Sequence, residues 1–231
     1  MKNRFISIVV NLVLCLVVGC VCIVGFGSGG AEQVASNGES VYYRAKNACG
    51  VSLMFNVYEN TENVYKILDI LDEYSAKATF FMGGCWADDN IDCVREVAFR
   101  GHEVGSHGYF HKDHSKLNYS QNLAEIRPSI KLLEAMLNRQ ITLFAPPSGA
   151  YCTATVTAAE ALNLKTIMWS RDTIDWRDSD VSLIYNRATK NLSNGEFILM
   201  HPKDVTVQAL PKILEYMKNN SLTAVTVLQN L

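Results

Sequence analysis

The sequence has no excess of charge of either sign. Its 231 residues carry 21 Lys and Arg against 23 Asp and Glu, which gives a formal net charge of −2, and no basic stripe stands out along the chain. Proteins that bind nucleic acid neutralise its phosphates with clustered basic residues. The charge balance therefore gives no support to a nucleic-acid partner, and we expect none.

The seven cysteines lack the paired spacing of a structural zinc site, which excludes the zinc-finger classes. Three of them lie in one apolar run, where we interpret them as apolar fillers. The other four, in an oxidising compartment, would allow up to two disulfides. Cys85 and Cys93 are close enough in sequence to pair locally, and free buried thiols are the alternative.

One long hydrophobic run opens the chain, because Lys2 and Arg4 precede an apolar stretch at Phe5–Phe26. A spanning helix needs about 20 apolar residues, whereas the core of a signal peptide has about 7–15. The length predicts a membrane anchor over residues 1–27. A cleavable signal peptide ending near Ala31 and a lipoprotein site at Cys20 are the alternatives.

The composition changes after this run. Residues 28–45 are rich in Gly, Ser, Ala and Asn, which predicts a flexible linker. Residues 46–231 are numerous enough for one domain with a substantial core. Basic residues before the apolar run place the domain outside the cytoplasm, either anchored to the membrane or secreted, and we expect a monomer there.

Short apolar runs alternate with stretches of helical periodicity from residue 46 onwards. Such alternation indicates βαβ units and a largely parallel sheet, and about seven repeats favour closure into a barrel. The expected strands are Val51–Asn56, Ala78–Phe81, His102–Gly105, Thr142–Phe144, Thr166–Trp169, Phe197–Met200 and Ala224–Val227. The expected helices are Glu62–Tyr74, Ile91–Phe99, Leu117–Leu137, Thr153–Leu162, Leu183–Asn191 and Pro211–Asn219.

Polar side chains follow several of the predicted strands. In barrels of this type the active site lies at the C-terminal ends of the strands. His107, Asp175 and His201 each fall just after such a strand, so we expect them on one rim. Asp113 and His114, close by, are interpreted as solvated polar residues.

His107 and His111 have the spacing of a metal pair. Two imidazoles four residues apart on a helical turn lie on one face, with their Cβ atoms about 5–6 Å apart. Imidazole suits zinc and its neighbours, and a catalytic zinc needs only one further protein ligand plus water. The spacing therefore predicts a metal site, with surface or helix-capping histidines as the alternative.

Five segments occur in the order seen in one known family. They are Lys77–Phe81, the strand Gly101–Gly105, the pair His107 and His111, Asp175-Trp176, and Leu199–His201. Together they make the chain from about Val51 to Leu231 resemble the polysaccharide deacetylases of the NodB-homology family. The resemblance implies an α/β fold, a distorted (β/α) barrel of about seven parallel strands in a single domain.

The same resemblance implies metal-assisted removal of N-acetyl groups from the amino sugars of a cell-wall or surface polysaccharide such as peptidoglycan. The metal, zinc or otherwise cobalt, nickel or iron, would be held by His107, His111 and a carboxylate. His201 would be the catalytic acid, with Asp175 orienting its imidazole; a helix N-cap is the alternative for Asp175. Predicted substrate contacts are Trp176, Leu199, Pro147 and Tyr151; core packing is the alternative for the first two.

Two motifs of the family are replaced here. Asn56 and Val57 stand where the family has two aspartates, a base and a metal ligand, and Ala145 stands for an arginine that orients the base. Glu62, or less favourably Glu59, is the candidate to act as metal ligand and catalytic carboxylate, and a first-turn helix carboxylate after a Thr61 cap is the alternative for Glu62. A catalytically inactive glycan-binding protein is the alternative to the hydrolase.

Overall fold

The computed structural model describes residues 41–46 and 48–231. The predicted anchor at residues 1–27 and most of the predicted linker lie outside the described residues. Strand β1 occupies Val41–Tyr42, so regular structure begins before the predicted domain boundary at residue 46. None of the helices in the described ranges is both long and apolar enough to cross a membrane.

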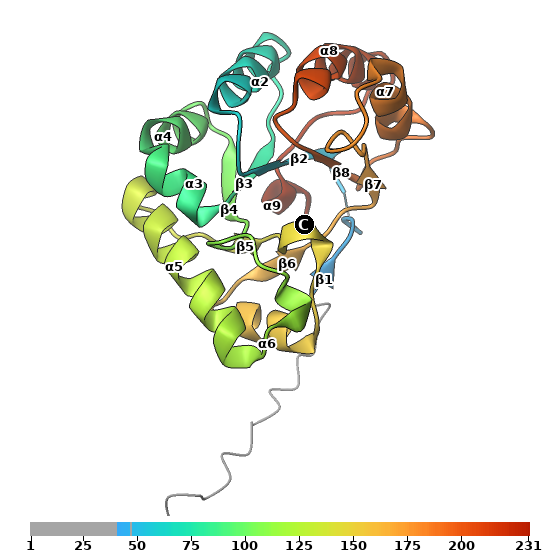
Figure 1. Ribbon diagram of the computed structural model, residues 1–231. Helices are drawn as coiled ribbons and strands as arrows, with labels where there is room; N and C mark the ends of the chain where they lie inside the picture. The colour runs from blue at the N-terminus through green and yellow to red at the C-terminus, as the bar shows by residue number, and fades with distance from the viewer. Residues whose placement is uncertain (1–40, 47) are drawn as a thin grey trace, which may run out of the picture. The chain divides into compact units, whose positions relative to one another are not determined.

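The described residues form one curled sheet whose strand order is β1-β6-β5-β4-β3-β2-β8-β7, and all of these neighbours pair in parallel (Figure 1). Its further strands are β2 (Ser52–Val57), β3 (Thr79–Met82), β4 (Glu103–Ser106), β5 (Leu143–Phe144), β6 (Lys165–Ile167), β7 (Arg171–Asp172) and β8 (Phe197–Met200). An antiparallel bridge between Arg44 and Glu196 links the residues just after β1 to those just before β8. The predicted distorted barrel is confirmed, with eight strands instead of about seven.

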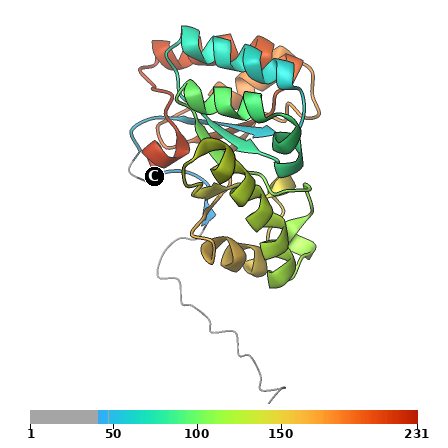
Figure 2. The same ribbon diagram turned by 90° about the vertical axis from the view of Figure 1, so that its left-hand side faces the viewer.

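All but the last of the helices lie around the outside of the curled sheet, and the last and shortest lies within the curl (Figures 1 and 2). They are α2 (Thr61–Glu73), α3 (Gly84–Asp89), α4 (Ile91–Phe99), α5 (Tyr119–Leu137), α6 (Thr153–Glu160), α7 (Val181–Thr189), α8 (Asp204–Asn219) and the short α9 (Val227–Asn230), with 3-10 turns at His114–Lys116 and Pro147–Gly149. Each of α2, α4, α7 and α8 has a buried apolar stripe, as an amphipathic helix on a sheet requires.

The two faces of the sheet have separate cores. Leu53, Phe55 and Val57 of β2 belong to the large cluster between sheet and helices. Met54 belongs instead to a smaller cluster inside the curl, which also holds Phe81. Because side chains alternate along a strand, Asn56 shares the interior face with Met54. The strand period therefore directs Asn56 inward and Val57 outward.

Several local predictions need correction. The predicted strand at Ala224–Val227 is wrong: Ala224 makes one isolated bridge to Val51, and Thr226 then caps α9 by accepting from the backbone N–H of Gln229. The four described cysteines are all free, so of the two alternatives left open for Cys85 and Cys93, free thiols or a local disulfide, the structure has the free thiols. Helix α3 and the two-residue strands β1 and β7 were not predicted.

His102 makes the fold sensitive to acid. It is 1% exposed, and its Nδ1 accepts the backbone N–H of Ala78 at 3.3 Å. Burial, and then the charge of Lys77, lower the pKa of His102 to about 4. Between that value and the ordinary histidine pKa of about 6.5, the unfolded chain binds the proton and the folded chain does not. This part of the stability is complete above about pH 6.5 and is lost as the pH falls towards 4.

We predict that His102→Asn flattens the pH dependence of stability. The free energy of unfolding of the unmodified chain should fall more steeply between neutral pH and pH 4, by at most about 1.4 kcal/mol per pH unit for this one histidine. Denaturant titrations of both proteins at a series of pH values measure the difference. Parallel curves for the two proteins would contradict the assignment.

Candidate active site

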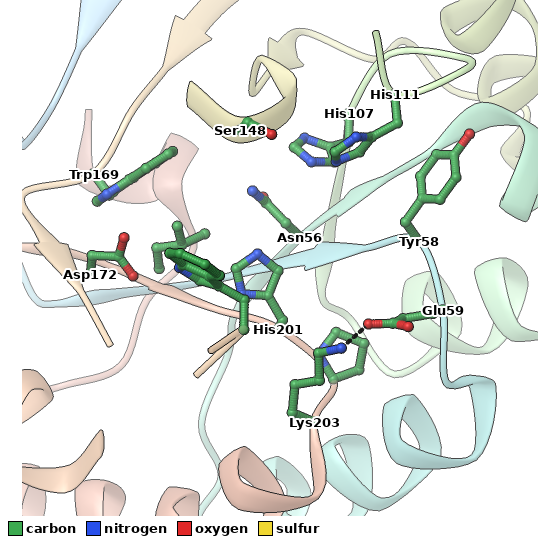
Figure 3. Close-up of a pocket in the computed structure, with 13 residues that line it drawn as sticks. Asn56, Tyr58, Glu59, His107, His111, Ser148, Trp169, Asp172, His201 and Lys203 are labelled. Atoms are coloured by element: carbon green, nitrogen blue, oxygen red, sulfur yellow. Dashed lines mark hydrogen bonds and ion pairs between the residues drawn. The ribbon is translucent and has the colours of Figure 1, made fainter. Parts of the chain in front are cut away.

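One pocket opens where the strands β2, β4 and β8 end (Figure 3). It is lined by Asn56, Tyr58, Glu59, His107, His111, Ser148, Trp169, Asp172, Trp176, Leu199, His201, Pro202 and Lys203. Both members of the predicted histidine pair and three other predicted site residues are therefore in this lining. The expected rim at the C-terminal ends of the strands is where the structure gathers these side chains.

A loop, not a helix, brings His107 and His111 together. His107 directly follows β4, and its backbone N–H donates to the carbonyl of Met82 at 2.9 Å. Residues 107–113 have no helical assignment, and His111 has a φ of 55° in the left-handed region. The two ring centroids are nevertheless 5.2 Å apart. The predicted closeness is correct and the predicted helical turn is wrong.

The two imidazoles are neutral at neutral pH. The Nδ1 of His107 lies 2.8 Å from the carbonyl oxygen of Ala145, so Nδ1 carries the proton and donates it, which leaves a lone pair on Nε2. Burial, followed by the neighbouring His111, lowers the pKa of His107 to about 3, and burial also lowers the pKa of His111. A neutral ring is the form that can bind a metal.

His201 is oriented by Asp175. Its Nδ1 lies 2.8 Å from Asp175 Oδ1, and its backbone N–H donates to Asp175 Oδ2 at 2.6 Å. The hydroxyl of Thr206 donates to the same Oδ2. Asp175 caps none of the described helices, so the helix N-cap alternative does not apply. Its carboxyl group accepts hydrogen bonds from His201 and Thr206 instead. Because Nδ1 donates to Asp175, Nε2 of His201 is left to exchange a proton with a bound ligand.

Trp176 and Leu199 line the pocket as predicted. Trp176 is 55% exposed and the Arg177 guanidinium lies 5.8 Å from its ring centroid, so this tryptophan is not a core residue. Leu199 is almost completely buried at the end of β8. The other two predicted substrate contacts, Pro147 and Tyr151, are not in the pocket lining: Pro147 is buried, and the Tyr151 hydroxyl lies 2.8 Å from that of Tyr43.

Glu62 does not line the pocket. It lies in the first turn of α2, its side chain is 83% exposed, and it pairs with Lys66 Nζ at 2.7 Å. Glu59 lines the pocket instead and forms an ion pair with Lys203 (Figure 3). Between them, Asn60 has a φ of 58° and is the N-cap residue of α2. The sequence had predicted Thr61 for this role. Glu62 is thus a first-turn helix carboxylate, which was the alternative to its prediction as a metal ligand and catalytic carboxylate.

The replaced motif residues leave no charge at the floor of the pocket. Asn56 is 4% exposed, and its Oδ1 is buried without a hydrogen-bond partner. Val57 is fully buried in the core behind the sheet, and Ala145 is fully buried with its carbonyl on His107. An unpaired buried polar group costs about 1–3 kcal/mol. Asn56 is thus a polar group whose bonding capacity is not used within the fold.

A divalent metal does not fit these residues as a catalytic site. Such a site needs three protein ligands and an open position, and His107 and His111 offer two. Within residues 41–46 and 48–231 there is no group of three or more His, Cys, Asp or Glu side chains arranged to hold a metal ion. Val57, at the family's ligand position, is apolar and faces away from the pocket. The pocket therefore supplies too few ligands for a catalytic metal ion.

Tyr58 and His114 were not recognised in their structural roles. The Tyr58 ring packs edge-on against His111, with centroids 5.1 Å apart, and its hydroxyl lies 2.7 Å from Cys85 Sγ. Burial raises the pKa of Tyr58. The strand period predicts that Tyr58 follows Asn56 to the interior face, a signal that could have found it. His114, expected to be solvated, is fully buried, with Nδ1 2.7 Å from Asn122 Oδ1.

The curled parallel barrel is also the fold of a family 4 carbohydrate esterase from Streptomyces lividans, whose solved structure has a TM-score of 0.72 at 26% identity and covers 77% of this chain and 92% of that one. The family model for polysaccharide deacetylase matches residues 44–167. The chain belongs to the polysaccharide deacetylase family. Relatives from Bacillus cereus and Listeria monocytogenes are named peptidoglycan-N-acetylglucosamine deacetylases, which are hydrolases that act on carbon–nitrogen bonds.

Two curated relatives have similar sequences. A peptidoglycan-N-acetylglucosamine deacetylase of Bacillus cereus is 33% identical over 168 residues, which cover 70% of this chain and 78% of that protein. The uncharacterized protein YlxY of Bacillus subtilis is 33% identical over 189 residues, which cover 82% of this chain and 59% of that protein. The chain thus spans well under two thirds of the length of YlxY.

The solved structure of BA3943 from Bacillus anthracis, described as a pseudoenzyme of the CE4 family, is also similar. Its TM-score is 0.80 at 29% identity, covering 84% of this chain and 69% of that one. A mutant of BA3943, with a TM-score of 0.80 and 28% identity, is described as having restored enzymatic activity. The fold of this chain is therefore shared with a protein described as a pseudoenzyme and with a mutant of it described as having restored activity.

We predict that the purified full-length chain does not keep stoichiometric zinc. After zinc loading and exhaustive dialysis, retained zinc should be well below one ion per chain, because two imidazoles without a carboxylate bind it weakly. His107→Ala, as the matched control, should retain the same amount. Retention of about one zinc per chain, and its loss in His107→Ala, would contradict the conclusion that these residues do not form a metal site.

Proposed function

We propose that this chain binds an N-acetylated amino sugar of a cell-wall or surface polysaccharide, such as peptidoglycan, in the pocket at the strand ends. One observation carries the proposal: apolar and polar groups converge in this pocket, while the neutral residues Asn56 and Val57 replace the groups that would activate water. Ligand sites of this kind are mostly apolar clefts in which a few fixed polar groups set the orientation.

The pocket offers apolar surface for the methyl group of an acetamide and hydrogen-bonding groups for its amide. Leu199 and Trp176 supply apolar surface for a methyl group and for a sugar face. Asn56 and His201 supply hydrogen-bonding groups beside that surface, and His201 is held by Asp175. Aromatic rings such as Trp176 combine a large apolar area with a fixed geometry, which suits stacking on a sugar ring.

At the two replaced family positions, this chain has no group that could activate water. Water attacks an amide when a base removes its proton or a metal lowers its pKa. An asparagine carboxamide at position 56 is not a base at neutral pH, and the buried Val57 cannot be a ligand. Replacing the base and its arginine partner together leaves no unpaired buried charge, so the fold tolerates the change.

Metal-dependent deacetylation of the same sugar is the second candidate. The His201–Asp175–Thr206 network favours it, because that network holds an imidazole where a leaving amine would need a proton. Glu59, on the pocket wall, would have to leave Lys203 to act as the carboxylate. Zinc, cobalt, nickel or iron would suit the imidazoles, and the relatives named as peptidoglycan deacetylases support this reaction.

A wall polymer as ligand is consistent with an exported protein. We propose that the apolar run at Phe5–Phe26 either anchors the chain in the membrane or directs its secretion, so that the pocket meets the polysaccharide outside the cytoplasm. We further propose that the protein acts as a monomer. Protease treatment of intact cells tests whether the pocket domain lies outside the cytoplasm. Light scattering of the purified chain tests whether it is a monomer.

Trp176→Ala should weaken binding of an N-acetylglucosamine tetramer by about tenfold or more, because the exposed ring is lost from the pocket wall. Phe99→Ala is the matched control, since Phe99 is 86% exposed on α4 and is not in the pocket lining. Calorimetric titration of the full-length proteins measures both affinities. Equal loss in the two variants, or no binding by the unmodified chain, would contradict the proposal.

Acetate release separates the two candidate functions. With zinc present, we expect the unmodified chain to release no more acetate from the tetramer than its His201→Ala variant. Release that depends on His201 and is abolished in Glu59→Gln, but not in the control Glu62→Gln, would establish the hydrolase instead. Glu62 is the appropriate control because it pairs with Lys66 outside the pocket.

A further inference from the structure

Ile174 has a strained backbone beside the pocket. Its φ of 57° lies in the left-handed region, where a β-branched side chain is an outlier because its Cβ crowds the backbone. The residue stands between Asp172, which lines the pocket, and Asp175, which orients His201. Such conformations persist only where the surrounding structure holds them, and they cluster at ligand sites. The loop that follows β7 therefore needs a group that keeps it in this turn.

The loop closes a tight turn at this residue. The N–H of Ile174 donates to Asp172 Oδ1 at 2.7 Å. Its carbonyl oxygen accepts the N–H of Arg177 at 3.2 Å and that of Asp178 at 3.0 Å. Both polar backbone groups of Ile174 are thus used inside its own loop, and the bonds enclose the two site residues that follow it.

One guanidinium, that of Arg187, joins the two ends of this turn. Its Nη1 donates to the carbonyl oxygen of Thr173 at 2.9 Å, and its Nη2 donates to Asp178 Oδ2 at 2.7 Å. Thr173 directly precedes Ile174, and the N–H of Asp178 closes the turn. Because the guanidinium is planar and presents its donors in a fixed fork, it sets the separation of the two acceptors. Arg187 is therefore placed to hold the left-handed turn closed.

Arg187 itself stands on a fixed element. It belongs to α7, whose buried face includes Ile184 and Ala188, and its side chain is 26% exposed. On the other side of the turn, the hydroxyl of Thr173 donates to the carbonyl oxygen of Leu199 on β8 at 2.8 Å. The turn is thus held between helix α7 and strand β8.

The turn sets the place of two consecutive site residues. Asp175 is buried, and its carboxyl group accepts from the backbone N–H of His201 at 2.6 Å, whereas Trp176 is exposed on the pocket wall. A change of φ at Ile174 would move both residues together, because they follow it directly in the chain. Neither Ile174 nor Arg187 lines the pocket, so an effect of either on a ligand passes through the loop between them.

We propose, on the basis of the proposed function, that Arg187 is a positioning residue: it holds the strained turn at Ile174 and so places Asp175 and Trp176 for the ligand. Glycine adopts a positive φ without the penalty that a Cβ brings. In an Ile174→Gly background the turn no longer has to be held, so Arg187 becomes dispensable. A residue that contributed only to overall stability would matter equally in both backgrounds.

The first test is Arg187→Gln in the otherwise unmodified chain and in the Ile174→Gly background. Calorimetric titration of the full-length proteins with the N-acetylglucosamine tetramer should show an affinity loss of about tenfold or more in the first case and of less than about threefold in the second. Arg187→Lys serves if Arg187→Gln fails to fold, because an ammonium has no planar fork to bridge the two acceptors. Equal losses in the two backgrounds, or no loss in the first, overturn the role of Arg187.

A second readout needs no ligand. The amide of His201 reports the place of Asp175, since it donates to that carboxyl group. In Arg187→Gln, hydrogen exchange at His201 should accelerate by about tenfold or more relative to the amides of β2, and Ile174→Gly should restore it. Arg100→Gln is the matched control, because Arg100 is 23% exposed and forms its ion pairs outside the pocket lining. It should leave the relative exchange at His201 within about twofold.

The two readouts separate the two levels of the account. An unmodified chain that binds no tetramer overturns the proposed function, and hydrogen exchange at His201 then still decides the role of Arg187. Exchange at His201 that changes in step with the β2 amides in every variant overturns that role, because loss of overall stability speeds all of these amides alike.

Discussion

The site depends on the parallel register of β2 with its two neighbours. Because β2, β3 and β8 run in one direction, the residues that follow them emerge at the same edge of the sheet. The two-residue period then decides which side chains enter the pocket: Asn56 points inward and Val57 packs against the helices. A shift of one residue would exchange them and bury an amide in the outer core. Pocket and core are therefore specified by the same hydrogen bonds.

The pocket has two halves with different electrostatics. On one side, both carboxyl oxygens of the buried Asp175 accept hydrogen bonds from His201 or Thr206. On the other side, Asn56 and the two neutral imidazoles carry no charge, and Asn56 keeps unused bonding capacity. A hydrogen-bonded network of this kind makes a rigid wall. The uncharged side suits the neutral acetamide of the proposed ligand.

Local patterns in the sequence were enough to predict elements of ordinary length and insufficient for the shortest ones. Helix α4 and strand β8 have the predicted bounds, because an uninterrupted periodic run defines each. The two-residue strands β1 and β7 have no period to detect, and the strand predicted near the C-terminus ignored the Thr226-x-x-Gln229 capping box. At the site, the positions just after predicted strands predicted that His107 and His201 gather, and the four-residue spacing predicted that His107 and His111 are close. The choice between Glu59 and Glu62 depended on the left-handed Asn60, which no periodicity reveals.

The central claim is that this pocket recognises an N-acetylated sugar without a metal. The most direct test is a calorimetric titration of the full-length chain with an N-acetylglucosamine tetramer, before and after removal of divalent metals by a chelator. The account predicts the same affinity in both titrations. Binding that disappears with the chelator and returns when zinc is added would contradict it.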